Sequence, residues 1–148
     1  MKKVLIFSAI LFLFSACTQS PSVLYNTPMK IGNAKLNVQV VSNSADMEQG
    51  LSGREKLQDT EGMLFDFKKS NNTRPSFWMK DMEFDLDFIW IKNGKVVEIT
   101  SDVKALKNNI DILKTYSPKE DVDMVLEVNS GWAQKNRVQI NDAVLIEK

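Results

Sequence analysis

The stretch "DFIWIKNGKVVEIT", residues 87–100, contains the clearest local structural signal in the chain. Its centre, Asn93-Gly94, supplies the two residues that a type I′ turn requires, because both adopt positive φ angles at low cost. Runs of β-branched and aromatic residues flank this pair. The stretch therefore predicts an antiparallel hairpin, with strands near Asp87–Lys92 and Lys95–Thr100.

The residues that lead into the hairpin, "SFWMKDMEFDLDFIW" (76–90), alternate in character. Even positions from 78 are large and apolar except Lys80, whereas odd positions from 81 to 87 are acidic. A single strand of this length would be unusual, so we expect a break at residues 81–83. Before the break, Trp78 and Lys80 should share a face. After it, the alternation predicts a face formed by Leu86, Phe88 and Trp90, opposite Asp87 and Ile89.

The rest of the chain also favours short strands. They are predicted at residues 34–41, 61–67 and 143–146, and a further strand in "VDMVLEVN" runs through about residue 129. A short helix over 45–49, capped by Ser44, and a helical turn that carries Trp132 are the expected helical segments. The predicted fold is mainly β, either an antiparallel sandwich or a partly closed barrel, with one or two short helices.

The N-terminus predicts export and lipid anchoring. Two lysines, an apolar run and the small residues of "FSAC" are typical of a signal peptide over residues 1–16. Cys17 stands where a bacterial lipobox places its acylated cysteine, although Phe14 replaces the usual Leu. We expect a lipidated tether over 17–33 and one β-rich domain over 34–148. A plain secretory signal with an incidental cysteine is the alternative.

This reading places the domain in the bacterial cell envelope, on the periplasmic side. Thr18, rather than Asp, follows the cysteine, which favours the outer membrane. The predicted partners are the membrane, through the lipid anchor, and a small ligand or an envelope protein. A monomer is expected.

Composition excludes several functional classes. The chain has 148 residues, 19 basic and 19 acidic, and no histidine. Loss of Lys2 and Lys3 with the signal leaves a net charge of −2, which argues against nucleic-acid binding. The absence of histidine excludes His-based triads and His-ligated zinc. No cofactor and no metal are predicted: the acidic run 81–87 lacks the glycine of an EF-hand loop, and Met79 and Met82 do not form a copper-type cluster.

Four ordered motifs resemble a known family. They are Gly50-Leu51-Ser52-Gly53-Arg54, Gly62 to Phe67, Phe77 to Lys80 with Leu86-Asp87, and Leu126 to Gly131. Together they resemble the domain of unknown function family 192, over about residues 34–147. The chain departs from the family pattern at Asp81-Met82, where Asn-Thr is usual, and at Asp85, where Pro is usual. The resemblance implies a compact β-rich fold and no established activity.

Charged residues inside apolar motifs mark the candidate site. Asp87 lies between Leu86 and Phe88, and a buried carboxylate requires a partner, for which Arg54 and Lys80 are the candidates. Trp78 and Met79 could form a pocket wall with Lys80 directed at an anionic or hydroxylated ligand, or could simply pack in the core. The candidate binding cluster is Arg54, Trp78, Met79, Lys80, Asp87 and Glu127.

The role of Glu127 and the function of the chain both have more than one interpretation. By alternation it shares a face with Val125 and Asn129, and simple exposure to solvent would explain it. The leading hypothesis is a lipid-anchored, non-enzymatic binding or accessory domain. One alternative is a carbohydrate hydrolase that uses Asp87 and Glu127 as paired carboxylates. Another is a purely structural module whose charged residues stabilise the fold.

Overall fold

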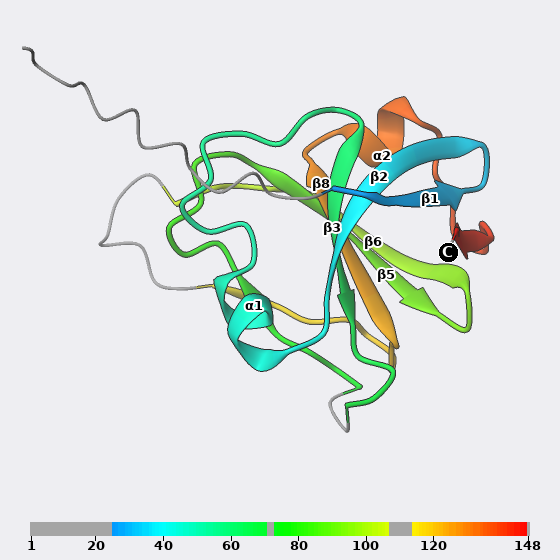
Figure 1. Ribbon diagram of the computed structural model, residues 1–148, viewed down its shortest axis with the longest axis horizontal. Helices are drawn as coiled ribbons and strands as arrows, with labels where there is room; N and C mark the ends of the chain where they lie inside the picture. Colours follow the sequence, from blue (N-terminus) through cyan, green and yellow to red (C-terminus); the bar gives the residue numbers. More distant parts are fainter. Residues whose placement is uncertain (1–24, 71–72, 107–113, 148) are drawn as a thin grey trace, which may run out of the picture.

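A computed structural model describes residues 25–70, 73–106 and 114–147 (Figure 1). The predicted signal peptide and Cys17 lie outside the described residues. The strands are β1 (Thr27–Ile31), β2 (Ala34–Val41), β3 (Glu61–Asp66), β4 (Phe77–Trp78), β5 (Leu86–Lys92), β6 (Lys95–Val103), β7 (Thr115–Tyr116), β8 (Met124–Asn129) and β9 (Val144–Ile146). The helices are α1 (Ser44–Gln49) and α2 (Trp132–Lys135). The prediction of a mainly β fold with short helices is confirmed. In the described part of the chain, no helix combines the length and apolar content needed to cross a bilayer.

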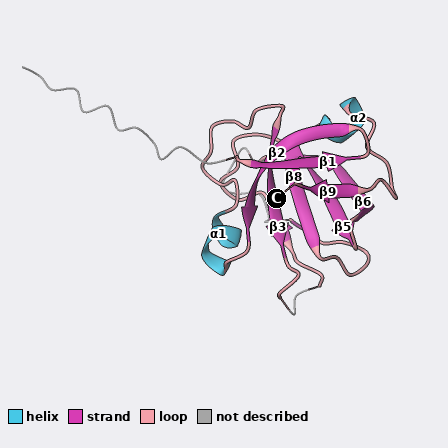
Figure 2. Ribbon diagram, turned by 45° about the vertical axis from the view of Figure 1, so that its right-hand side comes forward, coloured by secondary structure: helices cyan, strands magenta, loops and turns pink. Residues whose placement is uncertain are grey.

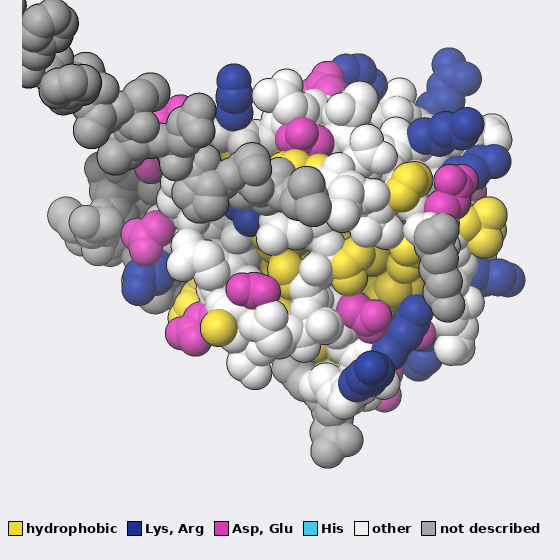
Figure 3. Space-filling model, viewed as in Figure 1, with side chains coloured by type: hydrophobic (Ala, Val, Ile, Leu, Met, Phe, Trp, Pro, Cys, Tyr) yellow, Lys and Arg dark blue, Asp and Glu magenta, His cyan; other side chains and the backbone are white. Residues whose placement is uncertain are grey.

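Seven strands form one curled sheet in the order β6-β5-β8-β3-β2-β1-β9, and β4 pairs with β7 separately. The sheet closes on itself at one end, where Lys95 and Ala143 form an isolated bridge and the Val144 N–H donates to the Gly94 carbonyl at 2.8 Å. Of the two predicted architectures, the structure is therefore the partly closed barrel. Figure 3 shows hydrophobic side chains at the surface in the region between β1 and the β5–β6 hairpin.

One strand pair departs from the expected antiparallel pattern. β2 and β3 are parallel, with Asn37 opposite Glu61. A parallel pair needs a long crossover, and α1 with residues 50–60 provides it. This crossover places α1 at one end of the sheet and leaves α2 at the other (Figure 2).

The predicted hairpin and the predicted break are both confirmed. Asn93 and Gly94 have φ angles of 51° and 69°, as a type I′ turn requires. β4 ends at residue 78 and β5 begins at 86, and between them Asp81 has a φ of 55°. The bend therefore separates the two short strands that the alternation indicated.

Both faces of the sheet are buried along its central strands β3, β5 and β8. One face forms a barrel core with residues from β1, β2 and β9, and it contains Ile89 and Val128. The opposite face forms a loop core, which contains Phe88 and Trp90 and is covered by α1, β4, β7 and the loops around them. Burial on both sides explains why β5 and β8 are apolar at almost every position. The predicted division of β5 into two faces is confirmed.

Two local predictions need correction. β1 lies at Thr27–Ile31, inside the segment expected to be tether, and pairs with β2 through a tight hairpin. The predicted domain boundary at residue 34 is therefore too late. The cap of α1 is Asn43 rather than Ser44, because the Asn43 Oδ1 accepts a hydrogen bond from the Asp46 N–H at 2.9 Å.

Candidate functional site

Asp87 is held by the backbone and not by a cation. Its side chain is fully buried on the barrel-core face of β5. Oδ1 accepts the N–H groups of Asp102 and Gly131 at 3.0 and 3.1 Å, and Oδ2 accepts the Ala133 N–H at 3.1 Å. The predicted pairing with Arg54 or Lys80 is wrong, because three backbone donors satisfy this carboxyl group.

Irregular backbone brings those donors to Asp87. The pairing of β5 with β6 shifts register between Leu86 and Phe88, so β6 bulges opposite Asp87. Asp102, within this bulge, has a φ of 58°. Gly131, at the start of α2, has a φ of 80°. Asp87 therefore ties a bulge and the first turn of α2 to one strand.

The acidic run before β5 does not act as one unit. Asp81 and Glu83 are exposed, whereas Asp85 accepts the Ala105 N–H at 2.8 Å and pairs with Lys104 at 3.0 Å. The backbone hydrogen bond from Ala105 is the main reason that the pKa of Asp85 is lowered, and burial opposes it. These polar contacts of Asp85 thus connect the segment before β5 to the residues that follow β6.

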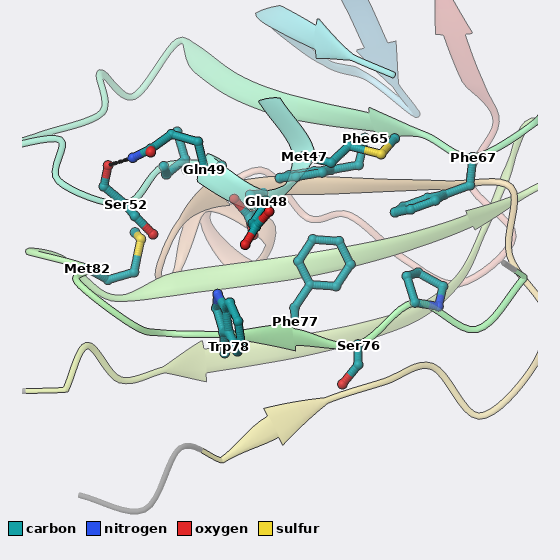
Figure 4. A pocket seen from close by; sticks show the side chains of 14 residues that line it. Met47, Glu48, Gln49, Ser52, Phe65, Phe67, Ser76, Phe77, Trp78 and Met82 are labelled. Carbon is teal, nitrogen blue, oxygen red and sulfur yellow. Dashed lines mark hydrogen bonds between the residues drawn. The ribbon is translucent and has the colours of Figure 1, made fainter. Parts of the chain in front are cut away.

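A pocket of about 300 Å³ lies on the opposite face of the sheet, between α1 and β4 (Figure 4). Its walls are mainly aromatic rings and thioethers. They include Met47, Phe65, Phe67, Phe77, Trp78 and Met82. The polar lining residues are Glu48, Gln49, Ser52, Ser76 and Glu127.

Backbone contacts join the two sides of this pocket. The Ser52 hydroxyl donates to the Lys80 carbonyl at 2.8 Å, and the Gly53 N–H donates to the Asp81 carbonyl at 2.8 Å. Phe77 packs edge-on against Phe65, with ring centroids 4.9 Å apart. These contacts position Trp78 at the mouth, where its side chain is 44 % exposed.

Glu127 is the buried acidic group of the pocket. It lies on the loop-core face of β8 with Val125, as the alternation predicted, but it is only 5 % exposed, so the interpretation as a solvent-exposed residue is wrong. No described residue donates a hydrogen bond to its carboxyl group. Burial raises the pKa of Glu127 to about 8, although the charge of Arg54 acts in the opposite direction. The carboxyl group is therefore mainly protonated at neutral pH.

Arg54 acts on Glu127 from a distance. Its guanidinium donates to the Gln39 Oε1 at 2.8 Å and to the Tyr25 hydroxyl, and it stacks 5.7 Å from the Tyr25 ring centroid. Arg54 is not among the residues that line the pocket. Both terminal nitrogens of the guanidinium thus donate to uncharged partners.

The other predicted site residues divide between pocket and core. Met79 is buried in the loop core, which is the core-packing alternative. Lys80 is exposed and lines an adjoining hollow, which shares Glu48, Gln49, Ser52 and Trp78 with the pocket. The structure thus brings Trp78 and Glu127 together, keeps Arg54 and Lys80 nearby and separates Asp87.

The separation of Asp87 from Glu127 excludes them as a catalytic pair. Asp87 is opposite Val128 in the β5–β8 pairing, and Glu127 is opposite Phe88. Neighbouring positions on a strand point to opposite faces. The two carboxyl groups therefore lie on different sides of the sheet, and a substrate cannot fit between them.

The predicted cluster contained only two of the 14 residues that line the pocket, Trp78 and Glu127. The α1 residues Met47 and Glu48 carry no periodic signal because the helix is a single short element. Phe65 and Phe77 do lie inside the family-like motifs. Membership of these motifs was the sequence signal from which both phenylalanines could have been predicted as site residues.

Comparisons with known proteins support the fold. The family model DUF192, described as "Uncharacterized ACR", matches residues 24–146. A search of curated proteins gave no significant match. A crystal structure from Sinorhizobium meliloti 1021, described as a candidate transcription regulator, has a TM-score of 0.71 at 25 % identity and covers 81 % of this chain and 92 % of its own. A protein of unknown function from Novosphingobium aromaticivorans has a TM-score of 0.70 at 23 % identity, with 80 % and 83 % covered.

Proposed function

This chain belongs to the DUF192 family, and on that premise we propose that it is a lipid-anchored envelope domain that binds a small, mainly apolar molecule between α1 and β4. The envelope location is supported by the signal-like residues 1–16 and by Cys17 at the lipobox position. Binding is supported by the pocket under Trp78. The proposal assigns no catalytic role to the chain.

The observation that carries this function is the unpartnered carboxyl group of Glu127 at an apolar pocket. Keeping a largely buried polar group without a hydrogen-bond partner costs free energy, and the Glu127 oxygens are not among the fully buried unpaired atoms of the described residues, so they remain open to the pocket. A ligand that hydrogen-bonds Glu127 would remove that cost. The pocket volume, about 300 Å³, lies at the lower end of the range for small-molecule sites.

DNA binding is not carried over from the Sinorhizobium protein. Proteins that grip the phosphate backbone present clusters of Lys and Arg. This chain has 19 basic and 19 acidic residues, and no basic residue is among the described residues that line the pocket. A small ligand therefore fits this chain better than a nucleic acid.

Ligand binding can be tested by NMR on the full chain in lipid nanodiscs, with ¹³C-labelled methionine methyl groups. A fragment library should contain compounds that shift the signals of Met47 and Met82, while Met29 in the barrel core stays unchanged. Trp78→Ala should abolish these shifts. Leu145→Ala, which removes a similarly exposed side chain on β9, should preserve them. A library that leaves both pocket methionines unmoved would reject the function.

The anchor can be tested independently of the ligand. Intact-mass measurement of the protein from membranes should show a diacyl or triacyl modification that Cys17→Ala removes. An unmodified, fully released protein would reject the lipid anchor and leave the binding proposal unaffected.

A further inference from the structure

The charge inside the pocket has one sign. Among the described residues, the charged side chains that line it are Glu48 on α1 and Glu127 on β8, and both are acidic. The nearby cations are engaged or lie outside the pocket. Arg54 binds Gln39 and Tyr25, and Lys80 lines the adjoining hollow. An anionic ligand would therefore meet two acidic side chains and no basic side chain within the described lining, and the nearest positive charge that acts on Glu127 is Arg54, outside it.

The apolar walls suit a positive charge. Phe65, Phe67, Phe77 and Trp78 present rings, and Met47 and Met82 present polarisable sulfur atoms. Aromatic faces attract cations through their quadrupole, most strongly where water is excluded. The same walls bury an apolar body by the hydrophobic effect.

The geometry points to the ligand class: a small apolar amine, bound as its ammonium ion, with the N–H groups donating to Glu127 and the apolar body between α1 and β4. This inference rests on the proposed binding function and specifies its ligand. The ammonium group would supply the hydrogen-bond donor that Glu127 lacks. Glu48, exposed on α1, would add a weaker attraction at the rim.

Binding of this kind must be coupled to protons. Burial raises the pKa of Glu127 to about 8, Arg54 opposes that rise, and Glu48 is the other acid of the pocket. An ammonium ion favours the ionised carboxylate, so its binding releases a proton from Glu127 below that pKa. Affinity should therefore rise about tenfold per pH unit towards pH 8 and then level off. An alkylammonium group similar to that of lysine stays charged over this range, because it titrates near 10.4.

The test compares 3-phenylpropylamine with 3-phenylpropan-1-ol, which has nearly the same shape and no charge. These two compounds and 3-phenylpropanoate, the matching anion, are titrated into the full chain in nanodiscs, with the Met47 and Met82 methyl signals as the readout. At pH 8 the amine should bind at least about tenfold more tightly than the alcohol. The amine's affinity should fall as the pH is lowered to 6, whereas that of the alcohol should stay constant.

Two variants locate the effect. Glu127→Gln keeps the side-chain shape and removes the charge, so it should abolish both the preference for the amine and the pH dependence while the alcohol still binds. Glu48→Gln should weaken the amine only about two- to fivefold, as expected for an exposed charge. Should Glu127→Gln fail to fold, the comparison of amine and alcohol in the unmodified chain decides the matter alone.

The outcomes separate the two levels of the proposal. Equal affinities for amine and alcohol, or tighter binding of 3-phenylpropanoate, would overturn the ammonium inference and leave the apolar pocket as a binding site. Failure of all three probes, together with an unresponsive fragment library, would overturn the proposed function as well.

Discussion

Two buried carboxyl groups lie on adjacent strands of this sheet, one register position apart, and their environments differ completely. Asp87 faces the barrel core beneath α2 and accepts three backbone N–H groups. Glu127 faces the loop core beside α1 and accepts none from the described residues, and burial raises its pKa to about 8. Burial alone therefore does not identify a functional acid. The missing partner makes Glu127 the candidate of the two, because a carboxyl group that accepts three backbone N–H groups has little capacity left for a ligand.

The largest effect on the free energy of unfolding should come from removing the Asp87 carboxyl group. Asp87→Ala leaves three buried N–H groups without an acceptor, so we expect a loss of about 4 kcal/mol of unfolding free energy. Urea denaturation followed by Trp fluorescence would measure it. Asp121→Ala, which removes only an exposed pair with Arg74, serves as the control and should cost less than about 1 kcal/mol. A similarly small loss for Asp87→Ala would mean that the backbone contacts stabilise little.

The Glu127 side should respond to pH instead. Its folded-state pKa of about 8 lies above the ordinary value of 4.5, so folding takes up a proton between these values. The contribution of Glu127 to stability is therefore complete below pH 4.5 and is lost as the pH rises through 8, by about 1.4 kcal/mol per unit. Glu127→Gln should remove this slope.

The measurement is the difference in unfolding free energy between Glu127→Gln and the unmodified chain, at intervals from pH 5 to 9. Taking the difference cancels the titration of all other groups. The unfolding free energy of the variant should rise relative to that of the unmodified chain as the pH increases to 8. A constant difference would show that the carboxyl group is ionised throughout.

Close backbone packing, rather than side-chain hydrogen bonds, fixes the position of Glu127. A Cβ atom at Gly62 would lie 2.9 Å from the Leu126 Cδ1, 3.0 Å from the Leu36 Cδ1 and 3.1 Å from the Glu127 carbonyl oxygen. Gly62→Ala should therefore cost about 1–3 kcal/mol and shift the pocket signals of Met47 and Met82. Gly53→Ala would not serve as a matched control, because Gly53 has a φ of 74° and an alanine would be strained there whatever the packing. Thermal melts measure the change in stability, and methyl spectra measure the change at the pocket. No change in either would show that β3 and β8 can move apart to accommodate the methyl group.

The smallest effect on stability is expected at the pocket mouth. Trp78 is 44 % exposed, so Trp78→Ala should change the unfolding free energy by less than about 1 kcal/mol while it removes ligand binding. Trp90→Ala, in the loop core, should cost several times more. Equal costs for the two variants would place Trp78 in the core and weaken the binding site.

Local patterns in the sequence predicted the hairpin at Asn93-Gly94, the faces of β5 and the family. They failed where distant segments meet. β1 is short and contains Pro28, so nothing in "TPMKI" indicated that the last strand of the chain would pair with it. The parallel pair of β2 and β3 likewise depends on a crossover that no local pattern encodes.

The candidate site was predictable only in part, for a physical reason. The alternation placed Glu127 on the correct face, and the motifs contained Trp78. The partner of Asp87 could not be predicted, because backbone N–H groups are present at every non-proline residue and leave no trace in residue types. The lack of a hydrogen-bond donor to Glu127 among the described residues likewise arises from how α1 and β4 pack over the sheet.

The early start of β1 sets how far the domain could stand from a membrane. Cys17 and Thr27 are ten positions apart, and even a fully stretched chain of that length spans at most about 36 Å. With Cys17 acylated as proposed, the domain would work within a layer roughly as thick as the bilayer itself. Amphiphilic molecules that collect at the lipid headgroups would then meet the protein at a far higher local concentration than molecules dissolved in the surrounding fluid.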